Sequence, residues 1–343
     1  MSESTKIRCG VIGVGRMGRH HARVYAQLEN ADFIGVVDHD DDKRNEIVEE
    51  WGGTAFSSIE ELIDAGVDAV TIATPTVTHL DVATPFLSKG IACLIEKPLA
   101  QTAEIASAIA DIATESGAVL QVGHVVRYDP VMRAIAAIEN LRPRFIEMTR
   151  ISPMTFRSTD VGVVLDMMIH DLDLLTMLLG NEPSEIHADA VSVISDAEDM
   201  CNARLVFPSE SDGFPCTANV TASRLAMKTE RKLRIISEAA YVSADFVNRS
   251  VTIIHKTAND AQLNDLRTRL AAGEDLTSVD FVEVLTVDEP EISNEDALTL
   301  QAKDFLHSIQ SGTKPVIDAE AGSMAIRTAE RIMQQATVAA KSH

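Results

Sequence analysis

The chain has 343 residues, with 52 Asp and Glu against 30 Lys and Arg and a formal net charge of −22. This acidity repels phosphate backbones and anionic membrane surfaces, and aromatic residues make up only 4% of the chain, which leaves few rings for base stacking. Nucleic-acid and membrane partners are therefore disfavoured, whereas the length and the 45% of apolar residues predict two folded domains.

The sequence also lacks the patterns of secreted and membrane proteins. No charged segment followed by a long apolar run begins the chain, and the longest apolar region, 161–179, contains four ionisable side chains. The four cysteines lie far apart without a C-x-x-C pair, so we interpret them as buried thiols. We therefore expect a cytoplasmic protein.

The first third of the chain alternates short apolar runs with segments of helical periodicity. Strands are predicted at 7–12, 33–38, 69–73, 92–95 and 119–122, and helices at 16–27, 41–50, 59–64, 77–89 and 102–116. Such alternation is typical of parallel strands joined by crossover helices. It predicts an α/β domain over residues 1–123, built on a doubly wound parallel sheet.

The pattern changes after residue 123. Helices are predicted at 130–140 and 164–179, and short segments with strand character recur between 185 and 286, among them 203–207, 218–222, 233–237 and 251–255. Two further helices are predicted at 294–311 and 319–340. We expect an α+β domain over residues 124–343 with a mostly antiparallel sheet, and last helices that pack on its edge or back on the first domain.

A glycine-rich motif joins the first predicted strand to the first predicted helix. The sequence Gly13-Val14-Gly15-Arg16-Met17-Gly18 matches G-x-G-x-x-G. Gly13 would allow the tight turn, Gly15 the close approach of a pyrophosphate, and Gly18 the packing of helix on strand. The N–H groups at the helix start would then bind the phosphates. A tight turn in some other α/β fold is the alternative interpretation.

An acidic residue follows this motif at the distance that ribose recognition requires. Asp38 lies at the end of the second predicted strand, where its carboxylate would accept hydrogen bonds from both ribose hydroxyls and repel a 2′-phosphate. NAD is therefore favoured over NADP, although Lys43 and Arg44 leave NADP open. His20 and His21, on the helix after the loop, are assigned no role.

The candidate chemical centre begins at the end of another predicted strand. Lys97, in Glu96-Lys97-Pro98, would lie where open α/β sheets bind their ligands, with its ammonium able to stabilise charge on a substrate oxygen. A surface lysine in a turn is the alternative.

A second group of polar residues lies within an apolar helix. Asp166, His170 and Asp173 recur at i, i+4 and i+7, so that Asp166 could orient His170 as a general base. A buried structural histidine is one alternative. A metal site is another, but a third ligand with diagnostic spacing is missing, and we predict none.

These motifs, in this order, resemble the Gfo/Idh/MocA family of sugar and cyclitol oxidoreductases over essentially the whole chain. The segments that carry the resemblance are 10–18, 73–79, 95–100 (IEKPLA), 122–130 (VGHVVRYDP) and 165–173 (LDMMIHDLD). The resemblance implies a Rossmann domain, a second domain on an open sheet that often mediates oligomerisation, hence a dimer or tetramer, and frequently a cis bond before Pro98.

The resemblance also implies residue roles. Lys97, Asp166 and His170 would be catalytic, with His170 removing the hydroxyl proton of a sugar while a hydride passes to the nicotinamide. The NAD site would comprise Gly13, Gly15, Arg16, Met17, Gly18, Asp38, Thr74, Pro75, His79, Glu96 and Lys97, and the substrate site His124, Arg127 and Tyr128. His124 and Arg127 could instead hold the domain junction together.

Within the family, the segments 122–130 and 161–175 are most similar to the branch containing UDP-N-acetylglucosamine 3-dehydrogenases, which act before transamination for lipid A or surface glycans. Val126, Tyr128 and Asp129 stand where that branch more often has Glu, Phe and Asn. The alternatives are an inositol or free-aldose dehydrogenase, a non-catalytic dinucleotide sensor, and a hydrolase that retains its cofactor.

Overall fold

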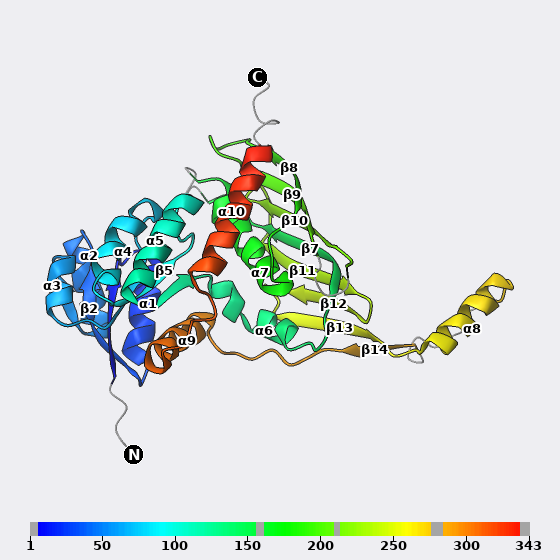
Figure 1. Ribbon diagram of the computed structural model, residues 1–343, viewed down its shortest axis with the longest axis horizontal. Coiled ribbons are helices and arrows are strands. Elements are labelled where there is room, and N and C mark those ends of the chain that lie inside the picture. The colour runs from blue at the N-terminus through cyan, green and yellow to red at the C-terminus, as the bar shows by residue number, and fades with distance from the viewer. Residues whose placement is uncertain (1–5, 156–160, 209–212, 276–283, 337–343) are drawn as a thin grey trace, which may run out of the picture. The chain divides into compact units, whose positions relative to one another are not determined.

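The computed structural model describes residues 6–155, 161–208, 213–275 and 284–336, which form two compact units (Figure 1). Of the described residues, the first unit comprises 6–129, Val164–Glu182 and 295–336, and the second comprises those within Pro130–Val163 and Pro183–Asn294. The units thus differ from the contiguous ranges 1–123 and 124–343, because later helices return to bury their apolar faces in the cores of the first unit.

The first unit is built on a six-stranded parallel sheet with the strand order β3-β2-β1-β4-β5-β6. Its strands are β1 (Ile7–Ile12), β2 (Ala31–Val37), β3 (Thr54–Phe56), β4 (Ala69–Ile72), β5 (Ala92–Glu96) and β6 (Leu120–Gly123). Ile12 pairs with both Val37 and Ile72, and Ile72 pairs with Ile95, so the carboxyl ends of β1, β2, β4 and β5 meet at one edge. This arrangement confirms the predicted doubly wound sheet.

Helices cover both faces of this sheet, because side chains alternate along its strands. On β5, Ala92 and Leu94 face a core shared with α1 and α9, whereas Cys93 and Ile95 face a core shared with α4, α5 and α10. The helices of the unit are α1 (Arg16–Gln27), α2 (Asp41–Trp51), α3 (Ile59–Asp64), α4 (His79–Leu87), α5 (Ala103–Ser116), α7 (Ile169–Leu179), α9 (Ala297–Ser311) and α10 (Ala319–Ala336).

Side-chain caps fix where two of these helices begin. The Asp40 carboxylate accepts a hydrogen bond from the Lys43 N–H at the start of α2, and the Ser58 hydroxyl accepts one from the Glu61 N–H at the start of α3, each at 3.2 Å. Each contact satisfies one of the N–H groups that a helix start leaves without an internal partner.

The second unit is an eight-stranded, mostly antiparallel sheet with the order β14-β13-β12-β11-β7-β10-β9-β8, in which β7 and β10 are the parallel pair. Its elements are α6 (Pro130–Ala136), β7 (Pro143–Ile151), β8 (Glu185–Val191), β9 (Met200–Phe207), β10 (Cys216–Ser223), β11 (Glu230–Ser237), β12 (Ala240–Asp245), β13 (Ser250–Lys256), α8 (Asp260–Ala271) and β14 (Leu285–Asp288). Burial alternates along β9 and β10, as expected for strands with one face in a core.

Elements β3 and α8 differ from the sequence-based expectation. The short β3 was not predicted, because three residues carry too little alternation to distinguish a strand from a loop. Helix α8 occupies a region predicted to contain strands, and it begins with a capping box in which Asn259 and Gln262 bond reciprocally. Residues 337–340 of the last predicted helix lie outside the described residues.

A buried carboxylate organises the loop between β8 and β9. Asp199 is fully buried, and one of its oxygens accepts hydrogen bonds from the N–H groups of Val193, Ile194 and Ser195 at 2.8, 2.6 and 3.0 Å. The Arg224 guanidinium lies 3.4 Å from the other oxygen. Burial alone would raise the pKa of Asp199, but the N–H donors outweigh it and hold the pKa well below the ordinary 3.8.

We expect Asp199→Asn to lower the free energy of unfolding by about 1–3 kcal/mol, because the amide loses the charge that strengthens the three N–H contacts and turns an NH2 donor toward Arg224. Since the folded-state pKa of Asp199 lies below its unfolded value, this contribution is present above about pH 4 and is lost as pH falls below it. Urea unfolding at several pH values measures the difference. The exposed Asp196→Asn is the control, and equal losses in both variants would contradict the assignment.

Candidate functional site

The glycine-rich loop leaves room for a ligand at one glycine and needs the other two for packing. Gly13 has a φ of +83°, and a Cβ there would lie 2.8 Å from the Ala73 carbonyl oxygen. A Cβ at Gly18 would lie 1.8 Å from the Gly13 carbonyl oxygen, whereas one at Gly15 would meet no atom within 4 Å. The open space is therefore at Gly15, where the dinucleotide motif requires close approach of phosphates.

The start of α1 suits an anion. Gly15 is its N-cap residue and has no side chain with which to bond the first N–H groups of the helix. Of the other loop residues predicted to bind the cofactor, Arg16 is exposed and Met17 packs partly against the core. The cradle fits the pyrophosphate of NAD.

Asp38 is fixed beside this loop. Its side chain is 7% exposed, and its two oxygens accept hydrogen bonds from the N–H groups of Val14 at 2.7 Å and Asp40 at 3.0 Å. Asp38, Thr74 and Pro75 line one cavity of about 610 Å³ at the carboxyl ends of β1, β2 and β4. The remaining lone pairs of the carboxylate fit ribose hydroxyls.

The two basic residues that left NADP open have partners of their own. Arg44 donates to the Asp38 carbonyl oxygen and, at 2.5 Å, to the Asp41 carboxylate, and its side chain is only 12% exposed. Lys43 lies 3.0 Å from the Asp40 carboxylate and lines the cavity. Arg44 therefore holds the turn after β2, which agrees with a preference for NAD.

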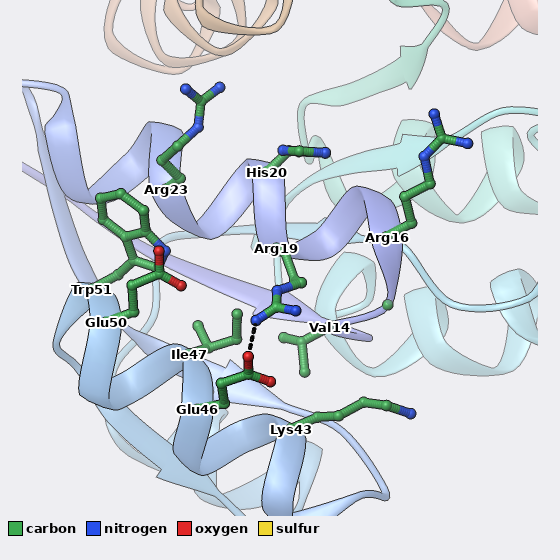
Figure 2. Close-up of a pocket in the computed structure, with 11 residues that line it drawn as sticks. Val14, Arg16, Arg19, His20, Arg23, Lys43, Glu46, Ile47, Glu50 and Trp51 are labelled. Carbon is green, nitrogen blue, oxygen red and sulfur yellow. Dashed lines mark hydrogen bonds and ion pairs between the residues drawn. The ribbon is translucent and has the colours of Figure 1, made fainter.

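A groove of about 680 Å³ between α1 and α2 adjoins the cofactor cavity, and Gly15 and Lys43 line both. Figure 2 shows Arg19 directed from α1 toward Glu46 of α2, with which it forms an ion pair. Trp51, the only tryptophan of the chain, lines the same groove. Its fluorescence can therefore report on binding near the loop.

His79 connects the turn after β4 to the segment that follows Lys97. Its Nδ1 lies 3.1 Å from the Leu99 carbonyl oxygen, and its Nε2 lies 3.1 Å from the Thr74 carbonyl oxygen. Burial lowers the pKa of His79, against the opposing effect of these hydrogen bonds. The ring thus has internal partners, and its contact with a cofactor stays a prediction.

Lys97 follows β5 at the same edge of the sheet, and the Lys97–Pro98 peptide bond is cis, as the resemblance implies. The Lys97 Nζ donates to the Asp166 carbonyl oxygen at 2.9 Å and lies 3.5 Å from the Asp166 carboxylate. The side chains of Lys97 and Asp166 are 20% and 41% exposed, so the ammonium is partly shielded yet reachable. The structure thereby brings together two of the three predicted catalytic residues.

Asp166 lies in a π-helical turn. The sequence predicted one helix over 164–179, but Val164–Met168 is π-helical and α7 begins only at Ile169. The wider turn changes the angular spacing of Asp166 and His170 from that of an α-helix. The ion pair that the structure shows for Asp166 is with Lys97, and its positioning of His170 stays a prediction.

The third predicted catalytic residue lies beside a buried polar cluster. His170, half-buried in the first turn of α7, meets the ring of His124 edge-on, with ring centres 6.5 Å apart. Burial lowers the pKa of His124, whose Nδ1 is 4.0 Å from the Asp173 carboxylate. Arg127 donates two hydrogen bonds to that carboxylate, at 2.8 and 2.7 Å.

The other predicted substrate contacts have internal partners. The Arg127 and Asp173 side chains are 7% and 1% exposed, and the buried Tyr128 donates from its hydroxyl to Asp304 at 2.5 Å. Sequence reasoning missed the Arg127–Asp173 pair, although both residues lie in the motifs that carry the resemblance. Contact of His124, Arg127 and Tyr128 with substrate stays a prediction.

A buried pair beside Lys97 was also missed. The Glu96 carboxylate lies 2.8 Å from Nε2 of His21 on α1. No sequence pattern links these two residues, which are 75 positions apart. Among the described residues, no cluster of three or more His, Cys, Asp or Glu side chains is arranged to hold a metal ion. The helices in the described ranges also include none long and apolar enough to cross a membrane.

The sheet, the phosphate cradle, Asp38 and the polar group around Lys97 define an NAD-binding oxidoreductase of the Rossmann type. Residues 7–124 match the GFO/IDH/MocA oxidoreductase family with its NAD-binding Rossmann fold, and residues 139–243 match the GFO/IDH/MocA C-terminal domain. The chain belongs to this family.

Several relatives are similar over most of their length. UDP-N-acetylglucosamine 3-dehydrogenase from Acidithiobacillus ferrooxidans is 33% identical, over 95% of this chain and 96% of its own. A solved structure of that enzyme superposes with a TM-score of 0.86 at 32% identity, covering 98% of this chain and 99% of the other. Myo-inositol 2-dehydrogenase from Thermotoga maritima is 26% identical over 93% of both chains.

We expect two glycine variants to separate cofactor binding from folding. Gly15→Ala fills the open space at the phosphate cradle and should weaken NADH binding by about tenfold or more with little change in thermal stability. Gly18→Ala should lower the free energy of unfolding by at least about 2 kcal/mol, since its Cβ meets a backbone carbonyl.

Quenching of Trp51 fluorescence by NADH measures the first effect, because the reduced nicotinamide absorbs where indole emits. Thermal unfolding measures the second. Unchanged NADH affinity in Gly15→Ala would place the phosphates elsewhere.

Proposed function

We propose that this chain oxidises the C3 hydroxyl of UDP-N-acetylglucosamine with NAD as the hydride acceptor. The observation that carries the proposal is the 33% identity to UDP-N-acetylglucosamine 3-dehydrogenase over 95% of this chain and 96% of the relative. The grouping of Lys97, Asp166 and His170 in one compact unit supports it, because oxidation of an alcohol needs a base and a cation at the reacting oxygen.

The proposed oxidation removes a proton from the hydroxyl oxygen and a hydride from the carbon that bears it. His170 takes the proton of the hydroxyl, and Lys97 holds the reacting oxygen and stabilises the negative charge that develops on it. Asp166, 3.5 Å from the Lys97 ammonium, keeps that side chain in place. NAD, when bound, supplies the nicotinamide that accepts the hydride from the same carbon, which leaves a ketone.

The proposal extends to the cellular compartment and the oligomeric state of the protein. The four cysteines are free and buried, which supports a reducing compartment, and we infer a cytoplasmic protein. We also propose that the chain forms a homo-oligomer, a dimer or tetramer, as the family resemblance implies.

An inositol dehydrogenase is the second candidate, favoured by the 26% identity to myo-inositol 2-dehydrogenase over 93% of both chains. The two candidates differ in whether the ligand carries a nucleoside diphosphate. A dinucleotide sensor without chemistry would need neither Lys97 nor His170.

We expect UDP-N-acetylglucosamine with NAD to raise the melting temperature and to generate reduced nicotinamide. A ligand at a hundred times its Kd adds about 2.7 kcal/mol to the stability of the folded state. Thermal unfolding and nicotinamide absorbance, with UDP and free N-acetylglucosamine as controls, test this. A response to inositol alone would favour the second candidate, and NAD binding without any response to a sugar would favour the sensor.

We expect Lys97→Ala and His170→Ala each to lower kcat by about 10²–10⁴-fold, because each removes a group that acts on the reacting hydroxyl. The Kd for NADH should change by less than about threefold, since the phosphate cradle and Asp38 are untouched. Steady-state kinetics and Trp51 quenching measure the two quantities. Lys89→Ala, at an exposed lysine, is the control, and normal turnover in both site variants would refute the assignment.

A further inference from the structure

A buried histidine–carboxylate pair connects the dinucleotide-binding helix to the strand that ends at Lys97. The side chains of His21 on α1 and Glu96 at the end of β5 are 1% and 9% exposed, and His21 Nε2 lies 2.8 Å from Glu96 Oε1. A carboxylate can only accept, so Nε2 carries the proton. Among the described residues, the buried Nδ1 of His21 has no hydrogen-bond partner.

The second oxygen of this carboxylate reaches the backbone of Lys97. Glu96 Oε2 accepts a hydrogen bond from the Lys97 N–H at 3.2 Å. Gly123 on β6 provides the space, since a Cβ there would lie 2.9 Å from Glu96 Cα and 3.0 Å from Oε2. The carboxylate is thus confined between two donors, one on α1 and one on the residue whose ammonium faces Asp166.

We propose that His21 is a positioning residue for Lys97, acting through Glu96. The proposal rests on the proposed function in one respect, which is the role of Lys97 at the reacting oxygen. His21 lies on the helix whose first turn forms the phosphate cradle, so the chain of contacts His21–Glu96–Lys97 ties the lysine to the element that binds the cofactor. Displacing a reacting group by about 1 Å can cost about 10²-fold in rate.

The same helix offers a matched control. Tyr25 lies one turn after His21, is buried, and its hydroxyl is 2.8 Å from the Thr71 hydroxyl. This contact has the same length and also joins α1 to the sheet, but it ends within β4 rather than at Lys97. Loss of either contact should destabilise the fold, and only loss of the first should alter Lys97.

Kinetics of three variants test the proposal. His21→Leu should lower kcat by about 10- to 100-fold, with the Kd for NADH changed by less than about threefold. His21→Gln, which keeps an N–H donor at a similar reach, should recover most of the loss. Tyr25→Phe should lower the melting temperature while kcat stays within about twofold of the parent.

A second readout needs no substrate. Limiting acetic anhydride, with acetylation mapped by mass spectrometry, compares Lys97 with the exposed Lys89 in the same sample. In His21→Leu and Glu96→Gln, the relative labelling of Lys97 should rise by about threefold or more, because the turn that holds the lysine loosens. In Tyr25→Phe it should not change. The glutamine in Glu96→Gln has the same shape as glutamate, but its NH2 faces one of the two donors, His21 Nε2 or the Lys97 N–H. This variant therefore tests the positioning role if His21→Leu does not fold.

The outcomes separate this proposal from the proposed function. Equal effects of His21→Leu and Tyr25→Phe on kcat and on Lys97 labelling would overturn the positioning role and leave the pair structural. Absence of turnover with every sugar in the parent protein would refute the proposed function, and the labelling comparison would still decide whether His21 positions Lys97.

Discussion

The contact between Gly18 and the carbonyl group of Gly13 sets the position of α1, and most of the site depends on that position. Because Gly18 has no side chain, α1 begins directly against the turn after β1. Gly15, at the start of this helix, leaves open space for a ligand. Further along the helix, His21 contacts Glu96 of β5 and Tyr25 contacts Thr71 of β4. The cofactor cradle and Lys97 therefore both depend on the position of α1.

Charge is distributed unevenly in this acidic protein. The chain carries a net charge of −22, yet its site contains cations held by carboxylates: Arg127 by Asp173 and Lys97 by Asp166. A buried ion pair such as Arg127–Asp173 adds little net stability, because desolvation offsets the attraction. Its two short hydrogen bonds instead fix the segment after β6 against α7, which also brings His124 beside His170.

The π-helical turn Val164–Met168 changes the angular spacing of two predicted catalytic residues, Asp166 and His170. In an α-helix, Asp166 and His170 would be neighbours on one face, and this spacing led to both residues as candidates. In this structure Asp166 lies in the π-helical turn and pairs with Lys97 from another element, while His170 lies in the first turn of the regular helix. Such turns occur often at functional sites, where they reorient a side chain without ending the helix.

The sequence by itself determined the parallel sheet, and it located the glycine-rich loop and the strand end that carries Lys97, because hydrophobic period, glycines and strand ends are local signals. It could not determine β3 or α8, whose apolar patterns are too short or too weak, nor the place of α7 in the first unit, and it left open whether the last helices pack there. Only the tertiary structure decided that His21 meets Glu96 and that Arg127 meets Asp173. These contacts depend on the packing of elements that are far apart in the chain, and no local sequence pattern indicates that packing.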